Sequence, residues 1–257
     1  EIYTLSLHDA LPIFYDIIEI DKAAETSVFT NLPYVPNDER NIAFRAAQAF
    51  FDYTKISGGV KIKINKSIPV GAGLGGGSSN AASVLSSLNT LYQAGLSRAE
   101  LERFGKTLGA DVPFFFVGGA CLAEGLGEVL TPIYPPIKAY AVIVKPDFFV
   151  STKWVYENLD LKKIVTRPNT SLLISAIKSG DVCCLAKNME NVLESVTVKR
   201  YPQIEKIKEQ LNKFGALGSM MSGSGSAVFG IFDSEKAAQS CAARMSDYKN
   251  VFISSFL

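Results

Sequence analysis

The sequence predicts an α+β protein with two halves, residues 1–146 and 147–257. Short runs rich in β-branched residues, which are typical of strands, are mixed with longer runs that repeat apolar residues at helical spacing. These strands and helices do not alternate regularly, which argues against a doubly wound parallel sheet. Prolines in Tyr-Pro-Pro (134–136) and Lys-Pro-Asp (145–147) interrupt the middle of the chain and favour a boundary there.

The expected elements follow from these periodicities, taken in chain order. Alternation predicts a first strand at FYDIIEI, and a helix with Asn37 or Asp38 as its N-cap precedes the next strand. Beyond residue 147 the pattern changes to helices, followed by a strand, a helix and a strand. The expected strands lie at 14–20, 59–68, around 119–131 and at 139–145, and the expected helices at 37–57, 78–93 and 97–109.

Charge and hydropathy argue against two classes of partner. The 26 basic and 25 acidic side chains leave a net charge of +1, which gives no concentrated basic face for nucleic acid. The longest apolar stretches, at 113–123 and 139–144, are far shorter than the roughly 20 residues that span a bilayer. We therefore expect a soluble cytoplasmic protein that acts on a small molecule, as a monomer or a homodimer.

The cysteines predict neither a disulfide framework nor a metal centre. Cys183 and Cys184 are adjacent, and together with Cys121 and Cys241 they fall at no metal-ligand spacing. One histidine, His8, is present to complete such a site. A chain of this length buries enough surface to fold without cross-links. We expect buried or free thiols in a reducing compartment and no zinc site.

The sequence PVGAGLGGGSSN, residues 69–80, lies between a predicted strand and a predicted helix. The unpaired N–H groups and the positive dipole end of that helix therefore face the loop. Glycines let the backbone close around phosphate oxygens, and the serine hydroxyls add hydrogen bonds or hold Mg²⁺. The loop matches neither a Walker A motif nor a dinucleotide fingerprint, and a flexible surface connector is the alternative. The expected phosphate-binding residues are Pro69, Val70, Gly71, Ala72, Gly73, Leu74, Gly75, Gly76, Gly77, Ser78 and Ser79.

Three further segments accompany this loop: LGADVPFFF at 108–116, AEGLGEVLTP at 123–132 and SGSGSAVFGIF at 222–232. Together with GLGGGSSNAA they resemble the motifs of the GHMP kinases, from about Phe14 to the C-terminus. The resemblance implies the two-lobed GHMP kinase architecture, with an N-terminal lobe like domain 2 of ribosomal protein S5 and a ferredoxin-like C-terminal lobe. It also implies phosphoryl transfer from ATP with Mg²⁺. The form of the motifs is similar to that of members acting on the 2-hydroxyl of 4-diphosphocytidyl-2-C-methyl-D-erythritol in isoprenoid precursor synthesis.

The resemblance implies roles for two of these motifs. Asp111 of GADVP would be the base that orients or deprotonates the accepting hydroxyl, as phosphoryl transfer requires a positioned carboxylate. Its alternative is an aspartate at a turn or a helix end. Gly223, Ser224 and Gly225 would form a third motif beside the substrate, although alone they fit a hairpin turn equally well.

Three more residues are candidates for binding the substrate or ATP, and two of them have an alternative interpretation. Thr152 and Tyr156 are four apart and share a face if this stretch is helical. Family members place an aromatic residue at the position of Tyr156 to stack on cytosine, and a core tyrosine is the alternative. Asn41 edges the adenine pocket or caps a helix.

The first thirteen residues, EIYTLSLHDALPI, depart from the family. GHMP kinases begin with a strand that carries Lys-x-Asn-Leu, and the similar members follow it with Asp-Gly-Tyr-His, whereas here no lysine precedes Lys22. We therefore expect residues 1–13 to be foreign sequence, His8 to be inert and the chain as given to turn over slowly. Two other hypotheses remain, a non-catalytic nucleotide-binding remnant and another GHMP small-molecule kinase.

Overall fold

The computed structural model describes residues 15–125, 127, 129–160, 162, 164 and 167–256, so the segment expected to be foreign lies outside the described residues. The described chain forms two compact units. The first contains residues 15–70 and 75–131, and the second contains residues 71–74 and those from 132 onward. The predicted domain boundary between residues 146 and 147 stays a prediction.

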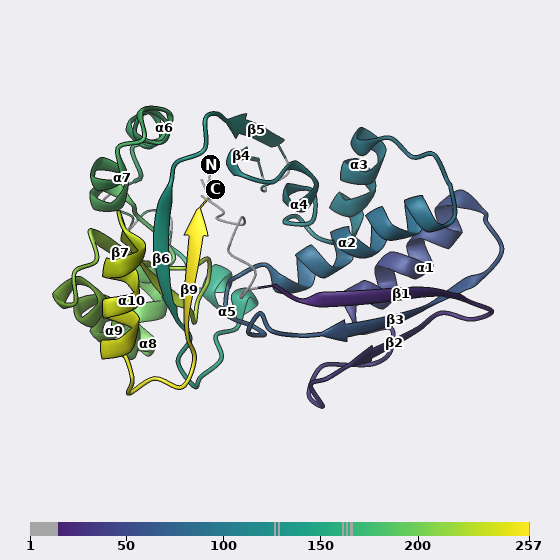
Figure 1. Cartoon of the computed structure of the whole chain (residues 1–257), viewed down its shortest axis with the longest axis horizontal. Helices are drawn as coiled ribbons and strands as arrows, with labels where there is room; N and C mark the ends of the chain where they lie inside the picture. Colours follow the sequence, from purple (N-terminus) through teal and green to yellow (C-terminus); the bar gives the residue numbers. More distant parts are fainter. Residues whose placement is uncertain are drawn as a thin grey trace. The chain divides into compact units, whose positions relative to one another are not determined.

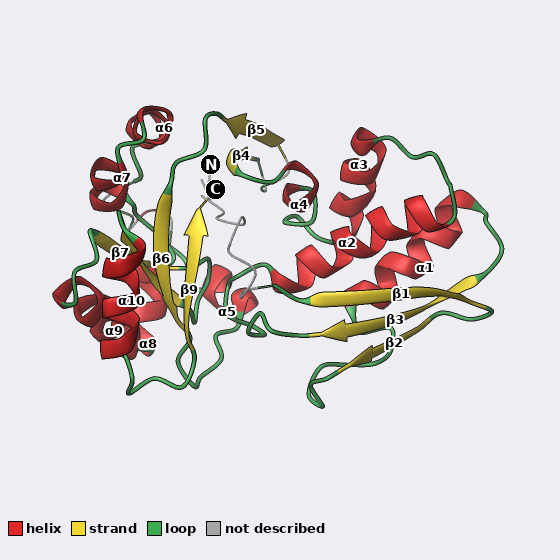
Figure 2. Cartoon of the chain, in the orientation of Figure 1, coloured by secondary structure: helices red, strands yellow, loops and turns green. Residues whose placement is uncertain are grey.

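Helices and strands are mixed along the chain, and the predicted α+β class is confirmed (Figures 1 and 2). Among the described helices, none combines the length and the apolar character that crossing a membrane requires. The elements are β1 (Ile17–Ala23), β2 (Ser27–Thr30), α1 (Ile42–Thr54), β3 (Gly59–Asn65), α2 (Gly76–Leu91), α3 (Arg98–Leu108), α4 (Phe114–Val117), β4 (Ala120–Glu124), β5 (Val129–Ile133), β6 (Ala139–Val144), α5 (Thr152–Glu157), α6 (Thr170–Ser179), α7 (Val182–Asn188), α8 (Glu194–Arg200), α9 (Gln203–Lys213), β7 (Gly218–Met221), β8 (Val228–Phe232), α10 (Glu235–Arg244) and β9 (Val251–Phe256).

The first unit is built on a sheet of strand order β1-β3-β2, in which β3 pairs antiparallel with β1 and parallel with β2. The alternation of β3 buries Val60, Ile62 and Ile64 and leaves Lys61 and Lys63 exposed. Helices α1 and α2 pack together over one face of this sheet (Figure 1). Each fully buried aliphatic side chain contributes roughly 1.5–3 kcal/mol, so this interface holds the strand that enters the glycine-rich loop.

Helix α1 begins later than the sequence predicted. Its N-cap is Asn41, whose Oδ1 accepts a 3.0 Å hydrogen bond from the backbone N–H of Ala43. The predicted N-caps, Asn37 and Asp38, were wrong: Asn37 accepts a hydrogen bond from the N–H of Thr30, and Asp38 pairs with the arginine two residues on. Residues 37–41 are polar and compatible with a helix, but they form the loop before α1. The helix starts where the repeat of apolar residues starts.

The second unit is built on an antiparallel sheet of strand order β7-β8-β6-β9 (Figure 2). Strand β8 is buried along its whole length, which explains why its sequence is continuously apolar rather than alternating. Helices α9 and α10 pack on the sheet. Ile204, Ile207 and Leu211 of α9, spaced at i, i+3 and i+7, enter the core.

Candidate functional site

Helix α2 begins at Gly76, two residues before the predicted start at Ser78. Its N-cap, Gly75, has a φ of 65° in the left-handed region that glycine tolerates best. The backbone N–H of Ser79 is the first to bond within the helix, to the carbonyl of Gly75. The N–H groups of Gly76, Gly77 and Ser78 therefore have no acceptor inside the helix, which suits an anion.

Two glycines of this first turn differ in what surrounds them. A β-carbon on Gly76 would lie 2.8 Å from Cγ2 of Ile68, so close packing against this residue, which follows β3, requires glycine here. A β-carbon on Gly77 would lie 3.6 Å from Cγ2 of Ile42, which is an ordinary contact. Close packing therefore explains the glycine at position 76. At both positions, the lack of a side chain leaves the peptide groups uncovered.

The hydroxyl of Ser79 donates a 2.9 Å hydrogen bond to the carbonyl of Gly76. This bond fixes the side chain within the first turn and leaves the lone pairs of its oxygen as acceptors. In the part of the chain that the structure describes, no group of three or more histidine, cysteine or carboxylate side chains is arranged to hold a metal ion. Hydroxyl oxygens such as those of Ser78 and Ser79 are of the kind that Mg²⁺ accepts as ligands.

Asp111 lies in the turn between α3 and α4, in the same unit as the start of α2. The turn is closed by a hydrogen bond from the N–H of Val112 to the carbonyl of Gly109, and Val112 and Phe114 are buried in the core. Asp111 itself is exposed by surface area, and within the described residues its carboxylate has no hydrogen-bond or ion-pair partner. The protein crowded around the carboxyl nevertheless raises its pKa above the ordinary value, by desolvation.

A second charged group near this loop escaped the sequence analysis. Lys66 and Asp16 form an ion pair whose side chains are 6% and 2% exposed. Lys66 continues the inward-facing series of Val60, Ile62 and Ile64, so its position in the alternation places it on the buried face. That alternation was the available signal, because a lysine at an inward position requires a partner.

In the second unit, the remaining loop residues contact the hairpin between β7 and β8. The hydroxyl of Ser222 donates a 2.8 Å hydrogen bond to the carbonyl of Gly73, and the N–H of Ala227 donates a 3.0 Å bond to the carbonyl of Ala72. A β-carbon on Gly73 would lie 2.1 Å from the carbonyl oxygen of Ser222. The two glycine-rich segments recognised in the sequence therefore meet, and glycine at 73 is needed for that approach.

Two polar side chains, those of Thr152 and Asn191, form hydrogen bonds with the β7–β8 hairpin. Ser224 is 7% exposed, and its hydroxyl lies 2.7 Å from that of Thr152, the first residue of α5. The amide of Asn191 donates to the carbonyls of Met221 and Gly223, each at 2.8 Å. These bonds fix the loop in one conformation and place two hydroxyls together, a pair suited to hydrogen bonding with a polyol.

The glycine-containing turn at 223–225 and the side chain of Tyr156 each had two interpretations from the sequence. Residues 222–227 do connect β7 to β8, so the hairpin interpretation is confirmed, and the substrate-facing role of Gly223, Ser224 and Gly225 stays a prediction. Tyr156 lies on α5 with 47% of its surface exposed, so it is not a core tyrosine. Its stacking on cytosine stays a prediction.

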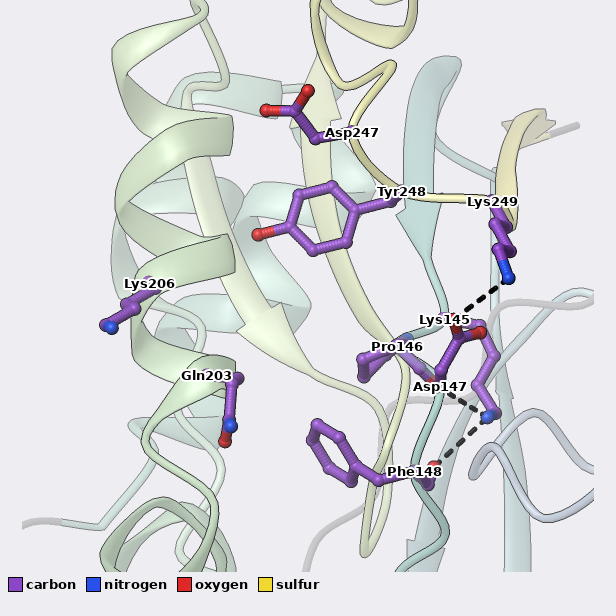
Figure 3. A pocket seen from close by; sticks show the side chains of 9 residues that line it. All are labelled: Lys145, Pro146, Asp147, Phe148, Gln203, Lys206, Asp247, Tyr248 and Lys249. Carbon is purple, nitrogen blue, oxygen red and sulfur yellow. Dashed lines mark hydrogen bonds and ion pairs between the residues drawn. The ribbon is translucent and has the colours of Figure 1, made fainter.

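The chain between β6 and α5 borders a pocket of about 320 Å³ that no predicted site residue lines (Figure 3). The ammonium group of Lys145 donates to the carbonyls of Pro146 and Phe148, at 2.6 and 3.1 Å. Burial lowers the pKa of Lys145, and the nearby Asp147 opposes that effect. The hydroxyl of Ser226 also donates to the carbonyl of Phe148, so this segment is tied to the β7–β8 hairpin.

Comparison with known proteins identifies both halves of the chain. A family model described as GHMP kinases N terminal domain matches residues 41–119, and a model described as GHMP kinases C terminal matches residues 173–250. The first range contains the start of α2 and Asp111, and the second contains the β7–β8 hairpin.

Relatives match over nearly the whole chain. A 4-diphosphocytidyl-2-C-methyl-D-erythritol kinase of Clostridium botulinum (strain Eklund 17B / Type B) is 47% identical over 241 residues, which cover 93% of this chain and 86% of that protein. A crystal structure of 4-(cytidine 5'-diphospho)-2C-methyl-D-erythritol kinase matches with a TM-score of 0.79 and 31% identity, covering 93% of this chain and 85% of that one. The homoserine kinase of Cytophaga hutchinsonii ATCC 33406 matches with a TM-score of 0.77 and 21% identity over 93% of this chain and 84% of that one, which shows a shared fold.

Proposed function

The chain belongs to the GHMP kinase family, and we propose that it transfers the γ-phosphoryl group of ATP to the 2-hydroxyl of 4-diphosphocytidyl-2-C-methyl-D-erythritol. The observation that carries the choice of acceptor is the 47% identity, over 93% of the chain, with a kinase named for that substrate. The fold shared with a homoserine kinase leaves the acceptor open, since that match is at 21% identity. The free thiols of all four cysteines support our proposal that the reaction takes place in the cytoplasm.

The start of α2 is the proposed binding site for the phosphates of ATP. The free N–H groups of Gly76, Gly77 and Ser78 and the positive end of the helix dipole favour an anion there. The expected phosphate-binding segment, Pro69 through Ser79, contains this turn at its C-terminal end. We propose Mg²⁺ as the metal: Ser78 or Ser79 would hold it beside the phosphates, and it would neutralise phosphate charge.

Asp111 is the proposed base. As the acceptor oxygen attacks the γ-phosphorus, the bond between that phosphorus and the β,γ-bridging oxygen breaks, ADP leaves and the hydroxyl proton passes to the Asp111 carboxylate. Two features of the structure support this role: the carboxylate has no partner among the described residues, and desolvation raises its pKa. A raised pKa makes the carboxylate a stronger base than an ordinary aspartate.

The proposed acceptor-binding residues are Thr152, Tyr156, Ser224 and the two glycines beside it. The hydroxyls of Thr152 and Ser224 are positioned together, and the hairpin glycines Gly223 and Gly225 keep the backbone there free of side chains. Tyr156 is exposed on α5 and offers an aromatic face for the cytosine ring.

The test is a substrate panel. ADP release is measured with ATP and, in separate reactions, 4-diphosphocytidyl-2-C-methyl-D-erythritol, homoserine or mevalonate. We expect kcat/KM for the cytidine-linked substrate to exceed that for the other two by at least about a hundredfold, as a site built to bond a base and a diphosphate discriminates strongly. A preference for homoserine or mevalonate would assign the chain to another branch of the family. ATP binding without turnover of any acceptor would favour a nucleotide-binding remnant.

A further inference from the structure

The buried ion pair of Asp16 and Lys66 does more than join two strands. The Lys66 ammonium donates to Oδ2 of Asp16, while Oδ1 accepts hydrogen bonds from the backbone N–H groups of Ser67 and Ile68, at 2.8 and 2.9 Å. One carboxylate therefore holds a cation and the two peptide groups that lead into the glycine-rich loop. Asn31 fixes the backbone of Lys66 from the other side, by accepting from its N–H at 2.7 Å.

Stability alone does not explain this pair. Ile17 is opposite Asn65 in the β1–β3 register, so Asp16 and Lys66 face each other one step beyond the ladder, both on the buried side. A pair that is only 2% and 6% exposed has lost most of its hydration, and well-packed apolar residues commonly stabilise such a position as well or better. An exposed pair on the same two strands, Glu19 with Lys63 at 3.1 Å, shows how these strands are joined without that cost.

The location of the Lys66 ammonium group suggests why a buried ion pair is present here. A β-carbon on Gly76 would lie 3.2 Å from Nζ of Lys66, so the cation lies beside the first residue of α2. A positive charge at a helix N-terminus is unfavourable in itself, because it lies next to the positive end of the helix dipole. The Asp16 carboxylate offsets this repulsion. An anion at the same helix start interacts favourably with both the dipole and the ammonium group.

We propose that Asp16 is a positioning residue for nucleotide binding: it holds the Lys66 ammonium beside the first turn of α2, where that charge attracts the phosphates of ATP. The inference rests on the proposed function in that ATP phosphates bind at this turn. It extends that function by assigning a cation to the phosphate site from within the described residues.

Three variants test the proposal: Asp16→Asn, Lys66→Met and the double variant Asp16→Asn with Lys66→Met. Asparagine keeps an oxygen that accepts from the N–H groups of Ser67 and Ile68, and methionine keeps the length of the lysine stem. For each variant, thermal unfolding gives the Tm, and calorimetry gives the affinity for ATP and for adenosine, without any phosphoryl acceptor. Adenosine lacks phosphates, so the ratio of the two affinities isolates the effect of charge at the phosphate site.

Each single variant leaves one buried charge without its partner, so we expect both to lower the Tm. The double variant removes both charges, and its Tm should return to near that of the unaltered chain. Its ATP affinity should stay about tenfold weaker, while its adenosine affinity stays within about twofold, because Lys66 acts on phosphate charge. Glu19→Gln and Lys63→Met are the matched controls on the same strands, and neither should change the affinity ratio.

Recovery of ATP affinity together with Tm in the double variant would overturn the proposal, since the pair would then be structural only. An equal loss of adenosine affinity would also overturn it. If the unaltered chain binds no ATP, the nucleotide site itself is refuted, and the inference with it. If it binds ATP and the variants behave as expected, the inference stands even where the acceptor in the proposed function proves to be a different molecule.

Discussion

The hydroxyl of Ser222 donates a 2.8 Å hydrogen bond to the carbonyl of Gly73, across 149 positions of sequence. This contact joins Gly73 to the β7–β8 hairpin within the second unit. The contact also shows that the glycines of this loop differ in how much space surrounds them. Gly73 is required by the close approach of another backbone, whereas Gly77 has room for a β-carbon.

We expect Gly73→Ala to destabilise the protein more than the same substitution at a glycine of similar φ elsewhere in the chain. Gly180, the C-cap of α6, has a φ of 71° against 76° for Gly73, and a β-carbon there would meet nothing within 4 Å. Gly180→Ala should cost about 1–2 kcal/mol from left-handed strain alone. Gly73→Ala should cost roughly a further 1–3 kcal/mol from the collision with Ser222. Urea unfolding measures both, and equal losses would refute the role of the contact.

Asp111→Asn should lower kcat by roughly 10²–10⁴ and leave ATP affinity unchanged, because it removes the proton acceptor and keeps the shape. Activity and calorimetry measure the two effects. Near-normal turnover would assign Asp111 to the turn alone.

The same substitution should raise the Tm at neutral pH. The pKa of Asp111 is raised in the folded protein, so its contribution to stability is greatest below the unfolded pKa and is lost as pH rises through the folded value. The variant's advantage should therefore disappear in acid. Asp38→Asn is the control with the opposite sign: Arg40 lowers the pKa of Asp38 to about 2, so that carboxylate stabilises the fold at neutral pH and stops doing so as the pH falls toward 2. A lower Tm for Asp111→Asn at neutral pH would contradict the desolvation argument.

The pH dependence of turnover gives an independent test of the base. Phosphoryl transfer requires the Asp111 carboxylate, so kcat/KM should fall as the pH drops through its pKa in the free enzyme. Since desolvation raises that pKa, the acid limb should lie above the value of about 3.9 for an ordinary aspartate. A profile without an acid limb above that value would mean that another group limits the reaction.

The hydroxyl pair of Thr152 and Ser224 predicts an effect on the acceptor. Thr152→Val keeps the shape of the side chain and removes its hydroxyl, so the KM for the cytidine-linked substrate should rise about tenfold with the KM for ATP unchanged, a loss typical of one hydrogen bond. Thr152→Ser keeps the hydroxyl and should stay near the unaltered value. If Thr152→Val and Thr152→Ser behave alike, the hydroxyl has no role in binding the acceptor.

Local patterns predicted much of this molecule. The alternation in GVKIKIN gave β3, the apolar repeat gave α1 and α2, and the motif residues gave a family that the domain matches confirm. The cap of α1 was assigned to Asn37 or Asp38 because several polar residues before Ile42 are compatible with an N-cap, whereas the alternative interpretation of Asn41 as a helix cap is confirmed. Asp16 went unrecognised as the partner of Lys66 because pairing between strands depends on register, which the sequence alone does not state.

Transfer of a phosphoryl group to one hydroxyl of one acceptor forms a bond that ³¹P NMR of the product observes directly. The chain is incubated with ATP, Mg²⁺ and 4-diphosphocytidyl-2-C-methyl-D-erythritol until ADP accumulates, so that even slow turnover is recorded. We expect one new phosphomonoester resonance, equimolar with ADP and assigned to the 2-position, and we expect it to be absent with Asp111→Asn. ADP accompanied by inorganic phosphate alone, or a phosphomonoester at another hydroxyl, would contradict it.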